Sequence, residues 1–172
     1  MPADPAVETN SLIRRLTADD ADELLALLVE NRAYLAPFGP PRDERFYTVE
    51  GQKERLERED KHGFAIIDDG RIAGTVALSN VVHGPLQSAN LGYWVAERVT
   101  GRGLATKAVS GVIPVAFGEL GLHRLEAGTL VDNIASQRVL EKNGFERIGI
   151  ARGYLHIGGD WRDHMLFQLL AD

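Results

Sequence analysis

The spacing of apolar residues changes period near the middle of the chain, and this change most constrains the fold. Apolar side chains alternate along residues 89–95, as in a half-buried strand, whereas from Gly103 they recur at helical spacing. Segments of both kinds follow one another in the order strand, helix, helix, strand, strand, strand, helix, strand, helix, strand, strand. The pattern therefore predicts a single mixed α/β domain.

The limits of these elements follow from turn and capping residues. Strands are expected at residues 12–16, 64–67, 72–78, 89–95, 124–131, 145–157 and 161–170. Helices are expected at residues 17–35, 49–60, 103–120 and 133–143. Pro114 should kink the third helix because proline cannot donate a helical hydrogen bond. Residues 1–10 carry two prolines and few anchors, so we expect a disordered N-terminus and a domain spanning residues 11–172.

Composition limits the classes of function. The 172 residues include no cysteine, which excludes disulfides and thiolate chemistry and fits a cytoplasmic protein. The first ten residues do not resemble a secretory signal, and no stretch approaches the roughly 20 apolar residues that cross a bilayer, so no membrane partner is expected. A net charge of −6 argues against a nucleic-acid partner and mildly favours cationic partners such as amines. Acidity that serves solubility alone explains this charge equally well.

Two glycines, Gly101 and Gly103, stand where a predicted strand leads into a predicted helix. Glycine lets a ligand approach the backbone closely, and the unpaired amides of a helix start suit a phosphate group. The local charge is about +2, from the side chains of Arg98, Arg102, Lys107 and Glu97. No Gly-Lys-Ser/Thr follows at P-loop spacing. The segment predicts a phosphate-binding loop, with a flexible turn as the alternative.

A second motif lies downstream, at Asn133 and Ser136. The two residues are three apart, so they share one face of the first helical turn. Taken alone, this pattern is typical of helix capping. Together with residues 100–105 and the Asn-Gly-Phe at 143–145, it resembles the GNAT superfamily. Within that superfamily the chain is similar to the RimJ/RimL branch, which acetylates the N-termini of ribosomal proteins, and the likeness extends from Leu12 through the last hairpin.

The resemblance implies a GNAT fold and acetyl-CoA as co-substrate. The fold is a mixed, mostly antiparallel twisted sheet of about seven strands with helices on both faces. Residues 91–95 and 125–131 should splay apart to admit the pantetheine arm. Thr100 departs from the Gln or Arg that is usual there, and Arg98 offers a shifted register. The coenzyme contacts implied are Val95, Arg98, Thr100, Gly101, Arg102, Gly103, Leu104, Ala105, Thr106, Asn133 and Ser136.

The resemblance also implies that a primary amine attacks the thioester directly. The backbone amide of Val95 should bond the acetyl carbonyl as negative charge develops on its oxygen. Ser136 should protonate the leaving thiolate, because Leu140 stands where many GNAT enzymes carry a tyrosine. Residues 151–154 supply no glutamate base. This favours a weakly basic acceptor such as a peptide α-amine, whose pKa is about 7.7–8, over lysine at about 10.4.

Three functions remain open on the sequence. The leading hypothesis is acetylation of a protein or peptide N-terminus. The others are acetylation of a small amine (a polyamine, amino acid or aminoglycoside) and non-catalytic sensing of acyl-CoA. Tyr34, Phe38 and Trp94 are candidate acceptor contacts, with ordinary packing as the alternative. No metal site is expected, because the histidines lack a third ligand at suitable spacing. A homodimer is an expectation of the family resemblance alone.

Overall fold

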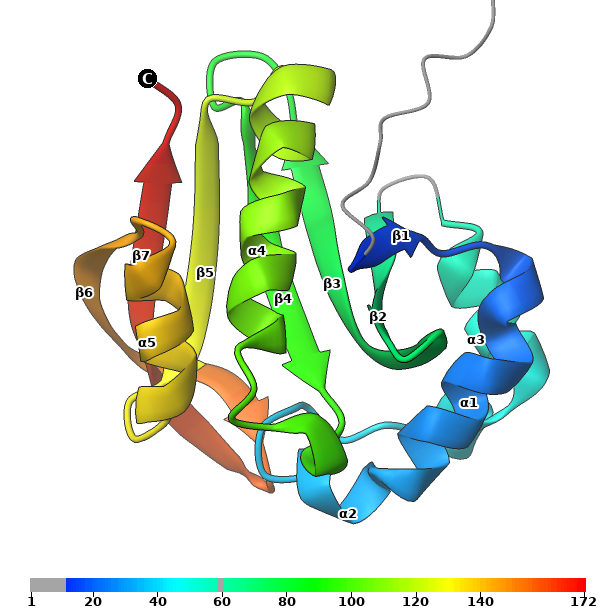
Figure 1. The fold of residues 1–172 in the computed structure, drawn as a ribbon. Coiled ribbons are helices and arrows are strands. Elements are labelled where there is room, and N and C mark those ends of the chain that lie inside the picture. Colours follow the sequence, from blue (N-terminus) through cyan, green and yellow to red (C-terminus); the bar gives the residue numbers. More distant parts are fainter. Residues whose placement is uncertain (1–11, 59–60) are drawn as a thin grey trace, which may run out of the picture.

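A seven-stranded sheet forms the centre of the computed structural model, which describes residues 12–58 and 61–172. The strand order is β1-β2-β3-β4-β5-β7-β6 (Figure 1). Each neighbouring pair is antiparallel except β4 and β5, which are parallel. The fold class and the number of strands are as predicted. The strands are β1 (Ile13–Arg15), β2 (Lys61–Asp68), β3 (Arg71–Val82), β4 (Ser88–Val95), β5 (Arg124–Leu130), β6 (Glu146–Ile157) and β7 (Asp160–Leu170).

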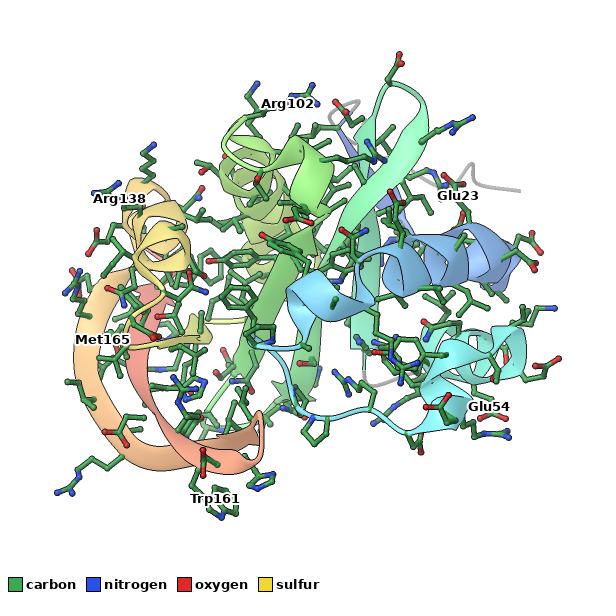
Figure 2. The ribbon with its side chains drawn as sticks, turned by 90° about the horizontal axis from the view of Figure 1, so that it is seen from below. Glu23, Glu54, Arg102, Arg138, Trp161 and Met165 are labelled. Atoms are coloured by element: carbon green, nitrogen blue, oxygen red, sulfur yellow. The ribbon has the colours of Figure 1, made fainter. Side chains whose placement is uncertain are left out.

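Helices cover both faces of the sheet. One face carries α4 and α5, and the other carries α1, α2 and α3 (Figure 2). No helix in the described ranges is both long enough and apolar enough to span a membrane. Residues 1–10, for which the sequence predicts disorder, lie outside the described residues. The helices are α1 (Ala21–Glu30), α2 (Arg32–Leu35), α3 (Val49–Leu56), α4 (Leu104–Pro114) and α5 (Ile134–Lys142).

The prediction of one continuous helix over residues 17–35 was wrong. A 3₁₀ turn at Ala18–Asp20 precedes α1, and the helix breaks at Asn31 before α2. The buried side chain of Asn31 donates to the carbonyl of Leu27 (2.9 Å) and accepts from the amide of Glu97 (2.9 Å). Because an asparagine side chain that bonds the backbone competes with the helical pattern, its bond to a distant segment accounts for the break.

Two other helices differ from prediction in detail. The helix α3 ends at Leu56 rather than at residue 60, and residues 59–60 lie outside the described part of the chain. At Pro114 the α-helix gives way to a π-helix at Val115–Glu119, and the amide of Leu120 bonds the carbonyl of Val115 (2.9 Å). Proline lacks the amide hydrogen for a helical bond, so the α-helical pattern is interrupted near Pro114, as predicted. The interruption is a π-helical turn.

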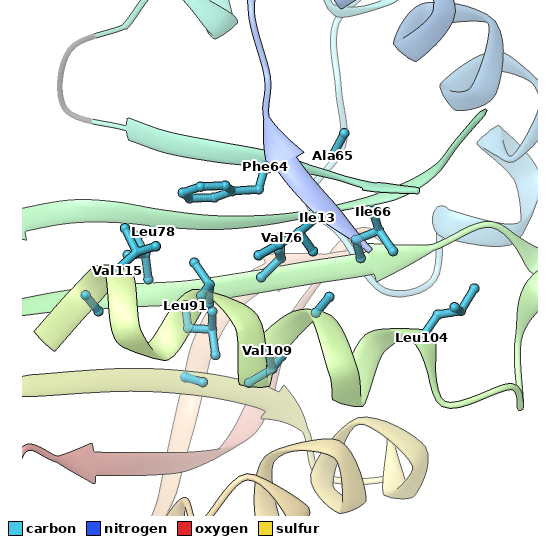
Figure 3. Close-up of a cluster of buried hydrophobic side chains, with 14 of the residues drawn as sticks. Ile13, Phe64, Ala65, Ile66, Val76, Leu78, Leu91, Leu104, Val109 and Val115 are labelled. Atoms are coloured by element: carbon cyan, nitrogen blue, oxygen red, sulfur yellow. The ribbon is translucent and has the colours of Figure 1, made fainter. Parts of the chain in front are cut away.

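The main core lies between the sheet and α4 (Figure 3). Val76 and Leu78 of β3 are fully buried there against residues such as Val109 of α4. Thr75 and Ala77 alternate with them and therefore face the side of α1–α3, where they are only partly buried. The face of β3 that carries Val76 and Leu78 thus packs in the core. The opposite face, with Thr75 and Ala77, can line a cavity.

The sheet divides between β4 and β5. These strands pair only where residues 88–90 meet residues 124–126. Beyond that point β4 stays with β3 as far as Val95, and β5 stays with β7 as far as Leu130. The ends of β4 and β5 therefore do not pair with each other. This is the separation of the two strands that the resemblance predicted. We call the space between them the β4–β5 gap (residues 91–95 and 127–130).

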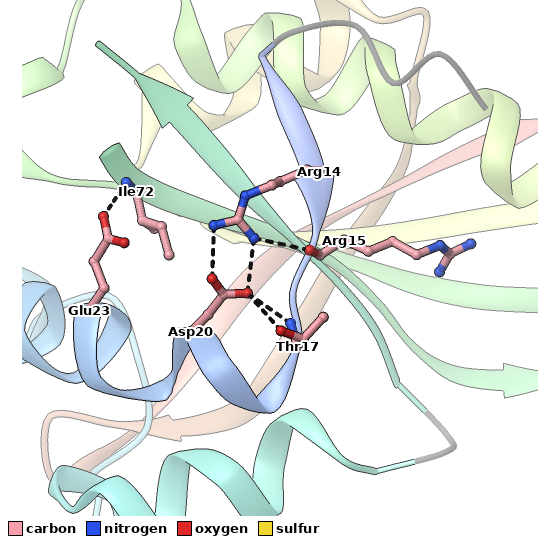
Figure 4. A network of polar contacts seen from close by, with 6 residues as sticks. All are labelled: Arg14, Arg15, Thr17, Asp20, Glu23 and Ile72. Atoms are coloured by element: carbon pink, nitrogen blue, oxygen red, sulfur yellow. Dashed lines mark hydrogen bonds and ion pairs between the residues drawn. The ribbon is translucent and has the colours of Figure 1, made fainter. Parts of the chain in front are cut away.

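An ion pair joins β1 to the start of the first helix (Figure 4). Arg14 donates two hydrogen bonds to the carboxylate of Asp20, at 2.8 and 2.9 Å. The same carboxylate accepts from the amide of Thr17 (2.8 Å), as in a capping box at a helix start. The bond from Arg14 lowers the pKa of Asp20 below its ordinary value. Asp20 is buried, so these bonds tie the edge strand to α1 with little competition from water.

Replacing Asp20 with asparagine is expected to destabilise the fold in a pH-dependent manner. Hydrogen bonds to a charged group contribute about 1.5–3 kcal/mol, so D20N should lower the free energy of unfolding at pH 7 by roughly that amount. The pKa of Asp20 is lower in the folded than in the unfolded chain. Its stabilisation is therefore complete above about pH 4 and is lost as pH falls through the folded pKa, so the difference between variants should shrink there.

Urea denaturation of both proteins from pH 7 to pH 3 measures this difference. The exposed turn residue Asp69 has a positive φ of 50° that asparagine tolerates, so D69N removes the same charge without touching the network. Its effect should stay within about 0.5 kcal/mol. A D20N variant as stable as D69N at pH 7 would contradict the role given to Asp20.

Candidate active site

The two glycines before α4 hold a conformation that other residues rarely adopt. Gly101 has a φ of 75° and Gly103 has a φ of 76°, and Gly103 caps the start of α4. A Cβ atom at either position would meet no atom within 4 Å, so neither glycine is required by packing. The first amide of α4 with a helical bond is that of Lys107, which donates to the carbonyl of Gly103 (3.1 Å). The preceding amides, at residues 104–106, remain available to a ligand.

Short bonds hold the segment before these glycines. The amide of Ala96 bonds Ala73 of β3 (2.7 Å), and the amide of Glu97 bonds Asn31 (2.9 Å). Thr100 donates its hydroxyl to the carbonyl of Glu97 (2.9 Å), so this side chain closes its own turn. Asn31 was not predicted as a site residue, because it lies 66 residues before Glu97 and has no local motif. Together these contacts fix the position of the glycine loop (residues 100–103).

The charge of the glycine loop is lower than the sequence count suggested. Arg102 forms two hydrogen bonds with Asp68 at the end of β2, at 2.8 and 2.9 Å. Figure 2 shows Arg102 beside the start of α4. Asp68 therefore offsets one of the three cations counted there, and Arg102 acts first as a link between the loop and the β2–β3 hairpin. Arg98 and Lys107 are exposed on the same segment.

The backbone amide of Val95 points into the β4–β5 gap. The next amide, that of Ala96, points towards β3, since it bonds Ala73 there. Successive amides of a strand point to opposite sides, so the amide of Val95 points away from β3. The carbonyl of Trp94 agrees with this alternation: a Cβ atom built at Gly74 of β3 would lie 2.2 Å from its oxygen. Val95 thus offers a donor in the gap.

A pair of hydroxyl groups spans the gap. The phenol oxygen of Tyr93, on β4, lies 2.8 Å from Oγ of Ser136, on α5, and 3.0 Å from the Ser136 carbonyl oxygen. Burial raises the pKa of Tyr93 to about 12, and its bond with Ser136 opposes this shift only in part. Tyr93 therefore keeps its proton at neutral pH. It was missed as a site residue because its partner lies 43 residues away, and the alternating pattern of β4 predicted only packing.

The helix α5 owes its position to capping contacts at both ends. Oδ1 of Asn133 accepts from the amide of Ser136 (3.2 Å), so Asn133 is the N-cap of α5. This agrees with the helix-capping interpretation of the sequence pattern. At the other end, Asn143 donates to the carbonyl of Thr106 in α4 (3.1 Å). Gly144, with a φ of 83°, and the amide of Phe145 complete a Schellman motif. These bonds hold Ser136 at a fixed distance from the start of α4.

A cavity of about 420 Å³ lies on the other face of the sheet, between the strands and α1–α3. Phe38 and Trp94, two of the three predicted acceptor contacts, form part of its wall, and Tyr93 borders it. The third, Tyr34, lies outside the wall and packs against Phe38 with a ring distance of 5.9 Å. The glycine loop, the β4–β5 gap and the cavity thus follow one another across the sheet. The volume of the cavity suits a small or peptide-like ligand.

Comparison with known proteins agrees with this arrangement. Residues 11–146 match the family model described as acetyltransferase (GNAT) domain. The chain is 42% identical over 167 residues to the probable N-acetyltransferase YjcK of Bacillus subtilis (strain 168), with 92% of each chain covered. It is 35% identical over 171 residues to the ribosomal protein uS5-alanine N-acetyltransferase of Escherichia coli (strain K12), covering 94% of this chain and 88% of that one. Mycobacterium smegmatis RimJ in complex with CoA-disulfide superposes with a TM-score of 0.85 at 31% identity, covering 92% of this chain and 81% of that one.

The family model covers residues 11–146, and these relatives cover 92–94% of this chain. Acetyltransferases of this kind use acetyl-CoA, and the open glycine loop and the β4–β5 gap fit the phosphate groups and the extended arm of that molecule. The chain belongs to the GNAT family of acetyltransferases, with relatives of the RimJ/RimL ribosomal-protein type.

Proposed function

We propose that the chain transfers the acetyl group of acetyl-CoA to the N-terminal α-amine of a protein or peptide, by direct attack of that amine on the thioester. The observation that carries this proposal is the hydroxyl pair of Tyr93 and Ser136 beside the amide of Val95. These groups lie in the β4–β5 gap, between the glycine loop and the cavity that borders Tyr93. A donor for an oxyanion and a donor for a leaving group thus stand close together.

The glycine loop and the start of α4 bind the coenzyme in this proposal. Their amides at residues 104–106 hold the pyrophosphate, with Arg98 and Lys107 as nearby positive charges. Asn133 contributes through its Nδ2, since its Oδ1 caps α5. Acetyl-CoA supplies the thioester carbonyl that the amine attacks. The amide of Val95 bonds the oxygen of that carbonyl, an interaction that strengthens as charge develops in the transition state.

Ser136 protonates the departing thiolate, and Tyr93 orients it. Tyr93 stays protonated, and its single proton can go to the carbonyl oxygen of Ser136 (3.0 Å) or to Oγ of Ser136 (2.8 Å). When it goes to Oγ, the serine proton points away from Tyr93 and towards the thiolate. Leu140, at the position where the resemblance places a tyrosine, is fully buried and carries no group that could donate a proton. Ser136 therefore provides the hydroxyl of α5 that protonates the thiolate in this proposal.

The cavity wall supports an α-amine as the acceptor. Among the described residues, those that line the cavity include no aspartate or glutamate, so the wall offers no carboxylate base. An α-amine with a pKa of about 7.7–8 is partly neutral at pH 7, whereas a lysine or polyamine amine is almost entirely protonated. The relative from Escherichia coli that is named for alanine of ribosomal protein uS5 points to the same acceptor class.

The proposed activity is tested by following thiol release from acetyl-CoA with peptides that begin in Ala or Ser, with the same peptides blocked at the N-terminus, and with spermidine. Free peptides should release thiol, and mass spectrometry should locate the acetyl group on the α-nitrogen. Blocked peptides and spermidine should release thiol at background rates. Thiol release with spermidine but with no peptide would contradict peptide acetylation and indicate that the acceptor is a small amine.

Replacing Gly103 with valine should abolish most coenzyme binding. A valine at Gly103 places a branched side chain where the phosphates approach, so the affinity for CoA measured by calorimetry should fall at least about tenfold. Gly84, in the β3–β4 connection at the opposite end of β4, has the same φ of 76° and the same open surroundings. The G84V control should share the backbone strain of about 1–2 kcal/mol yet bind CoA normally. Equal affinities of the two variants would overturn the placement of the pyrophosphate.

Removing the hydroxyl of Ser136 should slow turnover with little effect on coenzyme affinity. A positioned proton donor contributes about 100-fold or more, so S136A should lower kcat by that order. Y93F should lower kcat by about tenfold, and the double variant should be no slower than S136A, because the two hydroxyls act as a unit. Additive losses would show that Tyr93 acts independently of Ser136, and an unchanged kcat in S136A would remove the serine from the mechanism.

A further inference from the structure

The cavity beside β4 has a charge opposite to that of the whole chain. The chain carries −6, but the cavity wall has no carboxylate among the described residues, and its cationic and imidazole side chains are Arg15, Arg32, Arg42, Arg55, Lys61 and His62. Two of these arginines are neutralised locally, since Arg15 pairs with Glu119 and Arg32 pairs with Glu44. Within residues 12–58 and 61–172, neither Arg42 nor Arg55 forms an ion pair with a carboxylate.

Arg42 and Arg55 both contact one aromatic ring. Their guanidinium carbons lie 4.7 and 4.6 Å from the ring centre of Phe46. Arg55 also donates to Oε1 of Gln52 (2.8 Å), and Gln52 is itself fully buried and donates to the carbonyl of Phe46 (2.5 Å). The contact with Phe46 orients both guanidinium groups, and the bond to the buried amide of Gln52 also fixes Arg55, so the pair is partly organised for a ligand.

Holding two guanidinium groups so close without an anion is unfavourable. Burial and the charge of Arg42 lower the pKa of Arg55 to about 10. Burial also lowers the pKa of Arg42, an effect that Tyr47 and Asp43 oppose in part. An oxyanion between the two side chains would relieve the repulsion and match their planar donor geometry. A cationic acceptor would add to the repulsion.

We propose that Arg42 and Arg55 form an anion subsite that selects acceptors carrying an oxyanion, a carboxylate or a phosphate, within the first few residues after the reacting amine. The inference rests on the proposed function and specifies its substrate class. It reverses the expectation from the net charge of the chain, which favoured cationic partners. Its basis is local: the same cavity that reaches Tyr93 and Trp94 is lined by the two arginines.

Matched peptides that differ only at the second and third positions test the subsite. Three peptides begin with Ala and carry Gln, Glu or phosphoserine at the next two positions. The wild-type protein should acetylate at least one anionic peptide with a kcat/KM at least tenfold above that of the Gln peptide. The larger of the two preferences identifies the natural group. In the R42Q/R55Q variant this ratio should fall to about one.

Two controls isolate the effect of the cavity. Lys53 lies on α3 but is exposed and does not line the cavity, so K53Q should keep the full preference. R55K keeps the charge but loses the planar fork, and it should retain part of the preference. Melting temperatures and CoA affinities of all variants show whether each protein is folded and whether the coenzyme site is intact.

Binding without turnover separates this inference from the proposed activity. The N-acetylated Glu, Gln and phosphoserine peptides are titrated into the CoA-bound protein by calorimetry. A tenfold preference for an anionic peptide that disappears in R42Q/R55Q supports the subsite even if no peptide is acetylated, which would contradict the proposed activity alone. Equal affinities and equal rates for all three peptides in the wild-type protein would overturn the anion subsite.

Discussion

The early separation of β4 from β5 is the constraint on which the rest of the site depends. Three residue pairs join the two strands, after which each follows its other neighbour. Gly74 keeps β4 against β3, since a side chain there would collide with the Trp94 carbonyl. The unpaired inner edges would be costly to bury without partners, so a ligand that supplies hydrogen-bonding groups is what such a gap suits.

Buried and half-buried amide side chains hold together the segments around this site. Asn31 links α1 to the segment before the glycine loop, and Asn143 links α5 to α4. On the other face of the sheet, Gln52 bonds the carbonyl of Phe46 and accepts a hydrogen bond from Arg55. Each of these residues joins segments that are irregular or that belong to different elements. Fully bonded amides of this kind cost little to bury and specify one arrangement, which a catalytic site requires.

The distribution of charge separates the two sides of the sheet. On the coenzyme side, Asp68 already engages one arginine, so binding there relies on backbone amides and the start of α4. On the acceptor side, Arg42 and Arg55, which form no ion pair with a carboxylate of the described residues, line the cavity. The net charge of the chain does not predict the local charge on either side of the sheet, because it sums side chains that lie on different surfaces of the folded protein.

The sequence by itself determined the order of the elements, the glycine loop and the caps of α5, because these depend on hydrogen bonds and apolar periodicity within a few neighbouring residues. It also indicated the divergence of β4 and β5 through the family resemblance. Only the tertiary structure decided that Tyr93 meets Ser136, that Asn31 breaks the first helix, and that Arg42 and Arg55 share one aromatic ring. Such contacts join residues whose local patterns suggest only packing or solvated surface. The physical reason is that long-range pairs acquire their distance and burial from the packing of whole elements, which local periodicity does not encode.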